Sequence, residues 1–192
     1  MSASVRVRRL HSFDTREIAG LADVLIDCVE GGASVSFMLP ITREKAESFW
    51  RKSAESALRG ERLILVAEDA EGTIVGTVTV ILDLPENQPH RGDLAKMLVH
   101  RCARGRGVGA ALLQAAEDAA REAGRTLLVL DTVTGTAAAR LYARHGWQRC
   151  GEIPNYALWP DGRTCPTTIY YKSLTRPDRT PIEASVEASA HS

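Results

Sequence analysis

The sequence has no excess of charge of either sign. Its 192 residues carry 24 Lys and Arg against 24 Asp and Glu, and the sequence pI is near 7.0. Proteins that bind nucleic acid or an anionic membrane surface usually have a clear basic excess. We therefore expect no nucleic-acid partner and no membrane partner. A small neutral ligand, or a charged one bound by a local patch, fits the composition better.

Cysteines and long apolar runs are also scarce. The four cysteines form no Cys-x-x-Cys pair, and no His stands at ligand spacing, so the sequence predicts neither a disulfide framework nor a metal site. No segment approaches the roughly 18–20 apolar residues that span a bilayer, and the first residues contain no apolar stretch of signal length. We expect a soluble, cytoplasmic protein.

The length is typical of one domain with a substantial core. We expect that domain to span residues 1–174. Residues 175–192 contain too few large apolar side chains to pack, and they are predicted to be a disordered tail.

Apolar periodicity and turn residues predict the elements along the chain. Strands are predicted at 5–10, 62–69, 73–83, 94–100, 126–130, 147–153 and 167–172, and helices at 14–29, 42–59, 107–123 and 136–144. The run TLLVL at 126–130 is typical of a strand covered on both faces, and it closes a right-handed strand–helix–strand unit. The predicted fold is α/β, a mixed and mostly antiparallel sheet splayed at a central parallel pair near 94–100, with helices on both faces.

A glycine-rich segment lies between the predicted strand at 94–100 and the next helix. Gly105, Gly107 and Gly109 leave the backbone bare at a helix N-terminus, where successive N–H groups can bind an anion. Between Leu94 and Ala116 there are also four basic residues and no acidic one: Lys96, Arg101, Arg104 and Arg106. The segment predicts a phosphate site. The alternative is a glycine turn with solvated arginines.

Two other phosphate motifs fit less well. Gly105-x-Gly107-x-x-Ala110 resembles a dinucleotide fingerprint, with Asp131 near the ribose-binding position. However, several residues separate Gly105 from its strand, and too few residues follow for a doubly wound sheet. A Walker A loop is excluded because no Gly-Lys-Ser/Thr follows.

The same segment resembles the GCN5-related N-acetyltransferase (GNAT) family. Arg104-x-x-Gly107-x-Gly109 is similar to that family's R/Q-x-x-G-x-G/A motif, and TAAARLYARHGW at 136–147 is similar to its second signature. Two positions depart from the pattern: Arg101 stands where the family often has Pro, and Gly135 where it often has Asn.

This resemblance implies an N-acetyltransferase fold and acetyl-CoA as the cofactor. Backbone N–H groups of the glycine segment would bind the coenzyme pyrophosphate, with help from the arginines. The strand before it would pair its backbone with the pantetheine arm and stabilise an oxyanion. The implied cofactor-binding residues are Leu98, Val99, Arg104, Gly105, Arg106, Gly107, Val108 and Gly109.

Proton handling completes the site that the resemblance implies. Tyr142 takes the place of the family's acid, which protonates the leaving thiolate; by itself it is also typical of a core tyrosine. Asp131, at the carboxyl end of a strand, is a candidate base for the attacking amine, or else a turn residue. Glu30 is the competing base or ammonium anchor, or else an ordinary helix end.

The acceptor side is assigned to the segment 31–39. Glu30, Ser34 and Phe37 are the candidate substrate-binding residues, with Ser36 offering a further hydroxyl; a flexible connector is the alternative. Tyr156 and Trp159 are candidates for the opposite wall, or for core positions.

The sequence thus predicts an enzyme that acetylates the primary amine of a small molecule. Within the family, the chain is most similar to acetyltransferases that act on a β-lactam amino-acid toxin, through stretches such as GGASVSFM and CARGRGVG, which suggests a role in toxin or antibiotic resistance. A non-catalytic module that binds or senses acyl-CoA is the alternative. The oligomeric state is left open.

Overall fold

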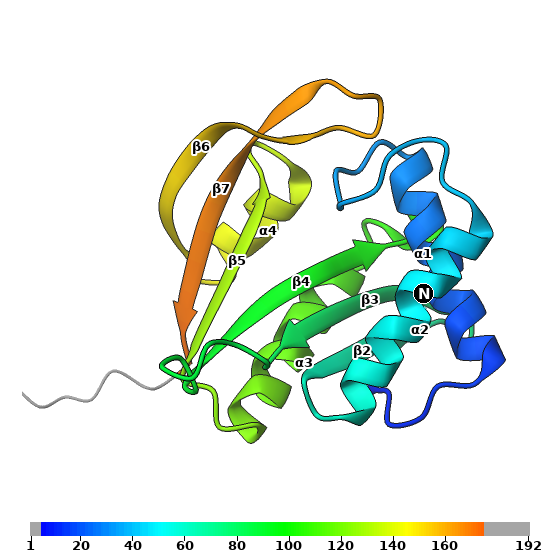
Figure 1. The fold of residues 1–192 in the computed structure, drawn as a ribbon, viewed down its shortest axis with the longest axis horizontal. Helices are drawn as coiled ribbons and strands as arrows, with labels where there is room; N and C mark the ends of the chain where they lie inside the picture. Colours follow the sequence, from blue (N-terminus) through cyan, green and yellow to red (C-terminus); the bar gives the residue numbers. More distant parts are fainter. Residues whose placement is uncertain (1–4, 175–192) are drawn as a thin grey trace, which may run out of the picture.

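A mixed seven-stranded sheet organises the chain, with the strand order β1-β2-β3-β4-β5-β7-β6 (Figure 1). A computed structural model describes residues 5–174, so the predicted tail at 175–192 lies outside the described residues. Neighbouring strands are antiparallel except β4 and β5, which are parallel. The strands are β1 (Arg6–Arg9), β2 (Arg62–Glu68), β3 (Ile74–Ile81), β4 (Arg91–Val99), β5 (Leu127–Val133), β6 (Gln148–Leu158) and β7 (Thr164–Ser173). The predicted fold class is confirmed.

Most helices begin at a side chain that caps the first turn. Asp14 accepts the N–H of Glu17, whose carboxylate accepts the N–H of Asp14 in return, so a capping box starts α1. Thr42 and Thr136 cap α2 and α4 in the same way with a single hydroxyl. The start of α3, at Gly107, has no side-chain cap. The helices are α1 (Thr15–Glu30), α2 (Arg43–Leu58), α3 (Val108–Glu122) and α4 (Ala137–Arg144), with a 3-10 turn, η1 (Arg101–Ala103), before α3.

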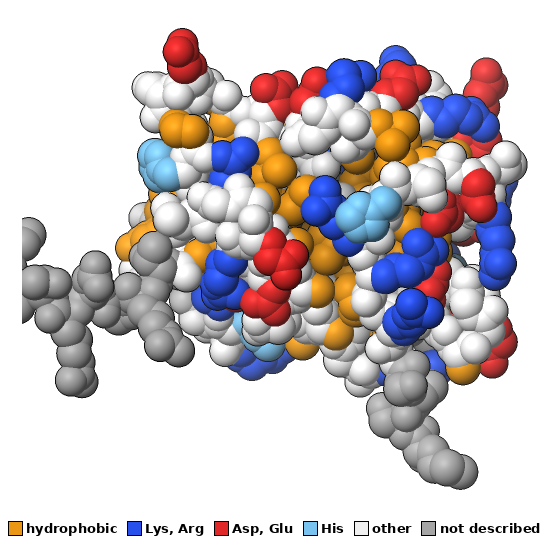
Figure 2. Space-filling model, turned by 90° about the horizontal axis from the view of Figure 1, so that it is seen from below, with side chains coloured by type: hydrophobic (Ala, Val, Ile, Leu, Met, Phe, Trp, Pro, Cys, Tyr) orange, Lys and Arg blue, Asp and Glu red, His pale blue; other side chains and the backbone are white. Residues whose placement is uncertain are grey.

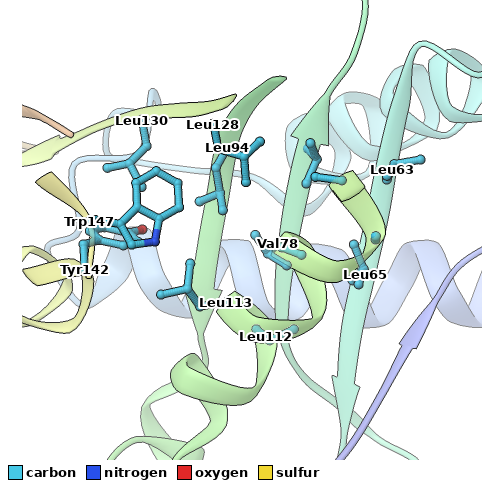
Figure 3. Packing of buried hydrophobic residues seen from close by; sticks show 14 of the residues in the cluster. Leu63, Leu65, Val78, Leu94, Leu112, Leu113, Leu128, Leu130, Tyr142 and Trp147 are labelled. Atoms are coloured by element: carbon cyan, nitrogen blue, oxygen red, sulfur yellow. The ribbon is translucent and has the colours of Figure 1, made fainter. Parts of the chain in front are cut away.

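Two apolar clusters hold the helices to the sheet, one on each face. The pair α1 and α2 covers one face, and α3 and α4 cover the other (Figure 1). Figure 3 shows the cluster beneath α3, where leucines of β2, β4 and β5 meet those of the helix. Tyr142 and Trp147 lie together at the β5 end of this cluster. The core therefore reaches the middle of the sheet, where β4 and β5 meet.

The parallel pair is short. The strands β4 and β5 are in register only at Arg91↔Leu127, Gly92↔Leu128 and Asp93↔Val129, and beyond this point they diverge (Figure 1). From Leu94 onward, β4 is paired with β3 alone among the described strands. One backbone edge of β4 is therefore left without a strand partner, which allows another extended chain to pair with it.

Some element bounds differ from the prediction. The strand β6 runs to Leu158 rather than ending at residue 153, because it is an edge strand with mostly exposed side chains and so has little apolar alternation to mark its length. The prediction that the TLLVL run at 126–130 is covered on both faces is wrong. Leu128 and Leu130 are buried beneath α3, whereas Leu127 and Val129 are half-buried on the face turned toward α1 and α2.

The surface mixes both signs of charge. On the face drawn in Figure 2, Lys and Arg side chains alternate with Asp and Glu side chains around apolar atoms. Within residues 5–174, no helix has the length and hydropathy of a membrane span. All four cysteines are free, with Cys28 and Cys165 buried and Cys102 and Cys150 exposed.

Candidate active site

The glycine loop presents bare backbone at the start of α3. Gly105 and Gly107 have φ of +74° and +81°, a region that side chains other than glycine rarely adopt. The first helical N–H bonded back to the loop is that of Ala111, which donates to the carbonyl of Gly107 at 3.0 Å. The amides of the first turn before Ala111 therefore have no acceptor in the helix, and no side chain caps them.

The glycines of the loop have different surroundings. A Cβ built on Gly105 or Gly107 would meet no atom within 4 Å, so the space beside both Cα atoms is open. Gly109 has a different role, because its Cβ would lie 3.2 Å from the Cδ2 of Leu141 on α4. The third glycine lets α3 and α4 approach each other. The loop thus combines an uncapped helix N-terminus, a favourable site for a phosphate group, with open space beside two of its glycines.

The arginines around the loop differ in their partners. Arg101 donates its backbone N–H and its Nε to the carboxylate of Asp27, both at 2.8 Å. Burial pushes the pKa of Asp27 upward, but the two bonds from Arg101 hold it below its ordinary value. Arg104 donates Nε to the carbonyl of Val99 at 3.0 Å, and Arg106 is exposed. The side chain of Arg101 is therefore held in an ion pair with Asp27, whereas the side chain of Arg106, within the loop, is exposed to solvent.

The predicted pantetheine strand lies on the unpaired edge of the sheet. Leu98 is buried against the α1 face and pairs with Thr77 of β3, and Val99 pairs with Gly76. The carbonyl of Val99 is already occupied by Arg104 and by the thiol of Cys28. Pairing with the cofactor arm would have to use other backbone groups of β4.

Tyr142 stands where β4 and β5 separate, on the α3 side of the sheet. Its ring is buried against Trp147 and Tyr170, at centroid distances of 5.7 Å and 6.1 Å. Among residues 5–174, its hydroxyl has no hydrogen-bond partner. Burial, with a smaller contribution from the charge of Asp131, raises the pKa of Tyr142 well above its ordinary value. The phenol therefore keeps its proton at neutral pH.

Asp131 lies on β5, just past the last residue paired with β4. Its side chain is exposed, and its Oδ2 accepts a hydrogen bond from the hydroxyl of Thr167 at 3.0 Å. The buried hydroxyl of Thr167 lies equally close, 3.0 Å, to the carbonyl of Thr132, so its single proton is shared between the two acceptors. The charge of Asp131 also contributes to the pKa shifts of Tyr142, Asp93 and Lys96, so these titratable side chains form one electrostatic group with it.

Two members of this group were missed from the sequence. Asp93 ends the paired part of β4. Burial and the charge of Asp131 raise its pKa, and the neighbouring guanidinium of Arg91 only partly opposes this. The sequence identifies Lys96 only as one of several basic residues. In the structure it lies on β4, beyond the last residue that pairs with β5. The predicted strand at 94–100 includes Lys96 but not Asp93, which lies within β4 in the structure, and the sequence pattern does not show where β4 and β5 separate.

The segment between α1 and α2 reaches across to the hairpin of β6 and β7. Ser34 donates its hydroxyl to the carbonyl of Leu158 at 2.6 Å, and the N–H of Leu39 donates to the carbonyl of Pro160 at 3.1 Å. Phe37 is buried in the α1 and α2 cluster, where it meets Phe49 edge to face at 5.2 Å. This segment is thus held by the β6–β7 hairpin on one side and by the α1 and α2 cluster on the other. The hydroxyl of Ser34 donates its proton within the protein.

Glu30 lies apart from the other candidates. It ends α1 and lines a surface hollow of about 400 Å³ together with Asp27, His100 and Cys102. Neither Tyr142 nor Asp131 lines this hollow. Tyr156 is largely exposed on β6, and Trp159 is half-buried at the hairpin turn. Within residues 5–174, no cluster of three or more His, Cys, Asp or Glu side chains is arranged to hold a metal ion.

Comparisons with known proteins agree with this geometry. Residues 60–149 match the family described as acetyltransferase (GNAT) domain, a range that includes β4, the glycine loop and Tyr142. An uncharacterised N-acetyltransferase from the hisH-hisA intergenic region of Azospirillum brasilense is 29% identical over 129 residues, which are 66% of this chain and 74% of that protein.

Solved structures share the fold over most of the chain. The yncA protein of Salmonella typhimurium, solved with its cofactor acetyl-CoA, superposes with a TM-score of 0.74 at 19% identity, over 94% of this chain and 99% of that one. The ribosomal-protein-alanine N-acetyltransferase of Brucella melitensis gives a TM-score of 0.71 at 26% identity, over 88% and 99%. With the match of residues 60–149 to the GNAT domain, these likenesses indicate an acetyltransferase of GNAT type with the GNAT fold.

Proposed function

We propose that this enzyme acetylates the primary amine of a small molecule, with the chemistry taking place where β4 and β5 separate. Acetyl-CoA supplies the acetyl thioester. The observation that carries the proposal is a buried phenol and a carboxylate on the neighbouring strand β5, near enough for the charge of one to act on the other. Tyr142 approaches from the α3 side, and Asp131, hydrogen-bonded to Thr167, lies on β5 within electrostatic reach of it.

The two groups suit the two proton transfers of the reaction. An alkylammonium ion has no lone pair, so the acceptor must lose a proton before its nitrogen bonds to the acetyl carbon. The carboxylate of Asp131 takes that proton, directly or through water. When the carbon–sulfur bond breaks, the Tyr142 hydroxyl gives its proton to the leaving thiolate. A tyrosine hydroxyl is protonated at neutral pH even at its ordinary pKa; the burial that raises the pKa of Tyr142 keeps it so but makes it a weaker acid.

Acceptor size is inferred from the segment between α1 and α2. The bonds from Ser34 to Leu158 and from Leu39 to Pro160 tie this segment to the β6–β7 hairpin. The tie leaves less room for an extended peptide than a free segment would. We therefore favour an acceptor of amino-acid size. The sequence resemblance to acetyltransferases that act on a β-lactam amino-acid toxin makes such a toxin the first acceptor to test.

A second candidate acceptor is the N-terminus of a protein. The observation that favours it is the likeness to the Brucella melitensis enzyme, a ribosomal-protein-alanine N-acetyltransferase. The tie between Ser34 and Leu158 argues against it, because a peptide entering from this side would have to displace that bond.

Release of free thiol from acetyl-CoA separates these acceptors. The assay compares single amino acids and small amines with a short peptide that begins with Ala. We expect thiol release with at least one small amine and none with the peptide. Turnover with the peptide alone would overturn the assignment of a small acceptor.

A further inference from the structure

Lys96 has an unusual backbone. It lies on β4 beyond the last residue paired with β5, where the register between β3 and β4 shifts between Thr77 and Thr79. Its φ is +49°, in the left-handed region that side chains other than glycine rarely adopt. The shift adds a residue to β4 and turns this side chain toward the face covered by α1 and α2. Such conformations persist where the surrounding structure enforces them, and they are frequent at functional sites.

The side chain of Lys96 reaches a second residue with the same backbone feature. Its Nζ donates to the Oγ of Ser36 at 3.2 Å and lies 5.6 Å from the centre of the Phe49 ring. Ser36, in the segment between α1 and α2, has φ of +75°. Lys96 and Ser36 are far apart in the sequence, yet both have backbone angles in the left-handed region and their side chains are in contact. Within residues 5–174, Asp131 forms no ion pair or hydrogen bond with Lys96, but its charge acts on Lys96.

The ammonium of Lys96 has few partners for a half-buried side chain. An ammonium has three N–H donors, and within residues 5–174 only Ser36 accepts one of them from Lys96, with no carboxylate within 4.0 Å. Lys172 shows the contrast. Its Nζ lies 2.6 Å and 2.8 Å from the two carboxylate oxygens of Glu117 and 2.8 Å from the carbonyl of His145. Burial lowers the pKa of Lys96, and the more distant Asp131 only partly opposes this.

We propose that Lys96 and Ser36 bind the carboxylate of the acceptor, which makes the preferred substrate an amino acid rather than a simple amine. The ammonium of Lys96 and the hydroxyl of Ser36 supply donors to the two carboxylate oxygens. The amine of the same molecule then faces the carboxylate of Asp131. The cation on β4 and the anion on β5 match the two charges of a zwitterion. This inference rests on the proposed function, because it places the acceptor beside Asp131.

Matched acceptors test the proposal. Each standard amino acid is assayed by thiol release beside its carboxamide and its decarboxylated amine. Losing a buried charge-assisted partner typically costs a factor of about ten or more in affinity. We expect the wild-type KM to be at least about tenfold higher for the carboxamide than for the acid, with a smaller change in kcat. Equal KM values for acid, carboxamide and amine would overturn the inference.

Substitution at Lys96 assigns the effect to that residue. Lys96→Met keeps the length of the side chain and removes its charge. This variant is expected to raise the KM for the acid to that of the carboxamide and to leave the KM for the carboxamide within about twofold. Lys45→Met is the matched control, because the Nζ of Lys45 also lies near a ring, 5.8 Å from the centre of Phe37, but belongs to an exposed residue of α2. It should change neither value.

Other outcomes separate this inference from the function on which it rests. If Lys96→Met lowers kcat equally for acid and carboxamide with no change in KM, Lys96 acts on the reaction rather than on the carboxylate, and the inference is wrong. Turnover with amines but not with amino acids also refutes it and leaves the proposed function intact. Binding of acetyl-CoA with no turnover of any acceptor refutes both. An unchanged Kd for acetyl-CoA shows that the variant has folded.

Discussion

The indole Nε1 of Trp147 donates a hydrogen bond to the Oε1 of Glu117 at 3.0 Å, inside the core beneath α3. The carboxylate of Glu117 is almost fully buried, at 2% exposure, and it also pairs with Lys172 of β7. Since Trp147 packs against Tyr142, the network connects α3 and β7 to the ring of the proposed acid. The ring of the proposed acid, Tyr142, is therefore positioned by a polar network outside the site.

Removing Glu117 should destabilise the fold. Glu117→Leu leaves the ammonium of Lys172 without its carboxylate, and removing one partner of a buried ion pair costs about 3–5 kcal/mol. Denaturant unfolding measures this loss. The double variant Glu117→Leu with Lys172→Met should recover a large part of it, because neither charge is then left alone. A double variant less stable than the single one would contradict this account.

Tyr142→Phe removes only the proposed proton donor. The ring stays packed on Trp147 and Tyr170, so the fold and the Kd for acetyl-CoA should be unchanged. General acid catalysis typically contributes a factor of about 10²–10⁴, and kcat should fall by an amount in this range. Tyr156→Phe, on the exposed edge strand β6, is the control and should retain full turnover. Wild-type turnover by Tyr142→Phe would rule out the acid role.

The pH profile distinguishes Asp131 from Glu30 as the base. A general base must be ionised to act, so it sets the limb of the profile in which kcat/KM rises with pH. Asp131→Asn should abolish or shift that limb and lower the rate at neutral pH. Glu30→Gln should leave the limb in place, because Glu30 lines a different hollow. A shifted limb in Glu30→Gln with an unchanged profile in Asp131→Asn would reverse the assignment.

Gly107→Ala tests the phosphate loop against a matched glycine. Both Gly107 and Gly162 have positive φ, +81° and +94°, and a Cβ at either would meet no atom within 4 Å. The two alanine variants should lose similar stability, about 1 kcal/mol from backbone strain. Only Gly107→Ala should also weaken the binding of acetyl-CoA, measured by calorimetry. Equal affinities in the two variants would place the coenzyme elsewhere.

Lys96→Met should change how stability depends on pH. Burial lowers the pKa of Lys96 in the folded protein, so between that pKa and the ordinary value of 10.5 the unfolded chain binds a proton that the folded chain does not. The stability of the wild type therefore rises with pH through this window. The variant lacks the half-buried charge and should melt at a higher temperature than the wild type at neutral pH, with the advantage shrinking toward pH 10.5. Thermal melts that show no such convergence would be inconsistent with a destabilising charge.

Local patterns predicted most of the fold. Capping residues such as Asp14, Thr42 and Thr136 stand next to amphipathic runs, and the helices begin at those residues in the structure. The exposed edge strand β6 was predicted too short, because its side chains carry little apolar alternation. The glycines at 105 and 107 were predicted to bare the backbone, and both have positive φ. Gly135 also has positive φ, +77°, which explains why glycine can stand where the family often has Asn.

The acceptor side depended on contacts that no local pattern encodes. Phe37 appeared suited to wall the site, but it is a core residue against Phe49. Lys96 lies at the proposed acceptor site because of a register shift between β3 and β4 and because its side chain contacts Ser36, 60 residues away in the sequence. The sequence alone shows neither the shift nor the contact, because both depend on how the sheet and the α1–α2 segment pack together.

Detection of the product tests the central claim most directly. Isotope-labelled acetyl-CoA is incubated with the enzyme and the amino-acid panel, and the amines are analysed by mass spectrometry. The account predicts labelled N-acetyl product for at least one amino acid with the wild-type enzyme, and a large loss of that product with Tyr142→Phe. Tight binding of acetyl-CoA with no labelled amine in any reaction would contradict it and favour a protein that binds the coenzyme without transferring its acetyl group.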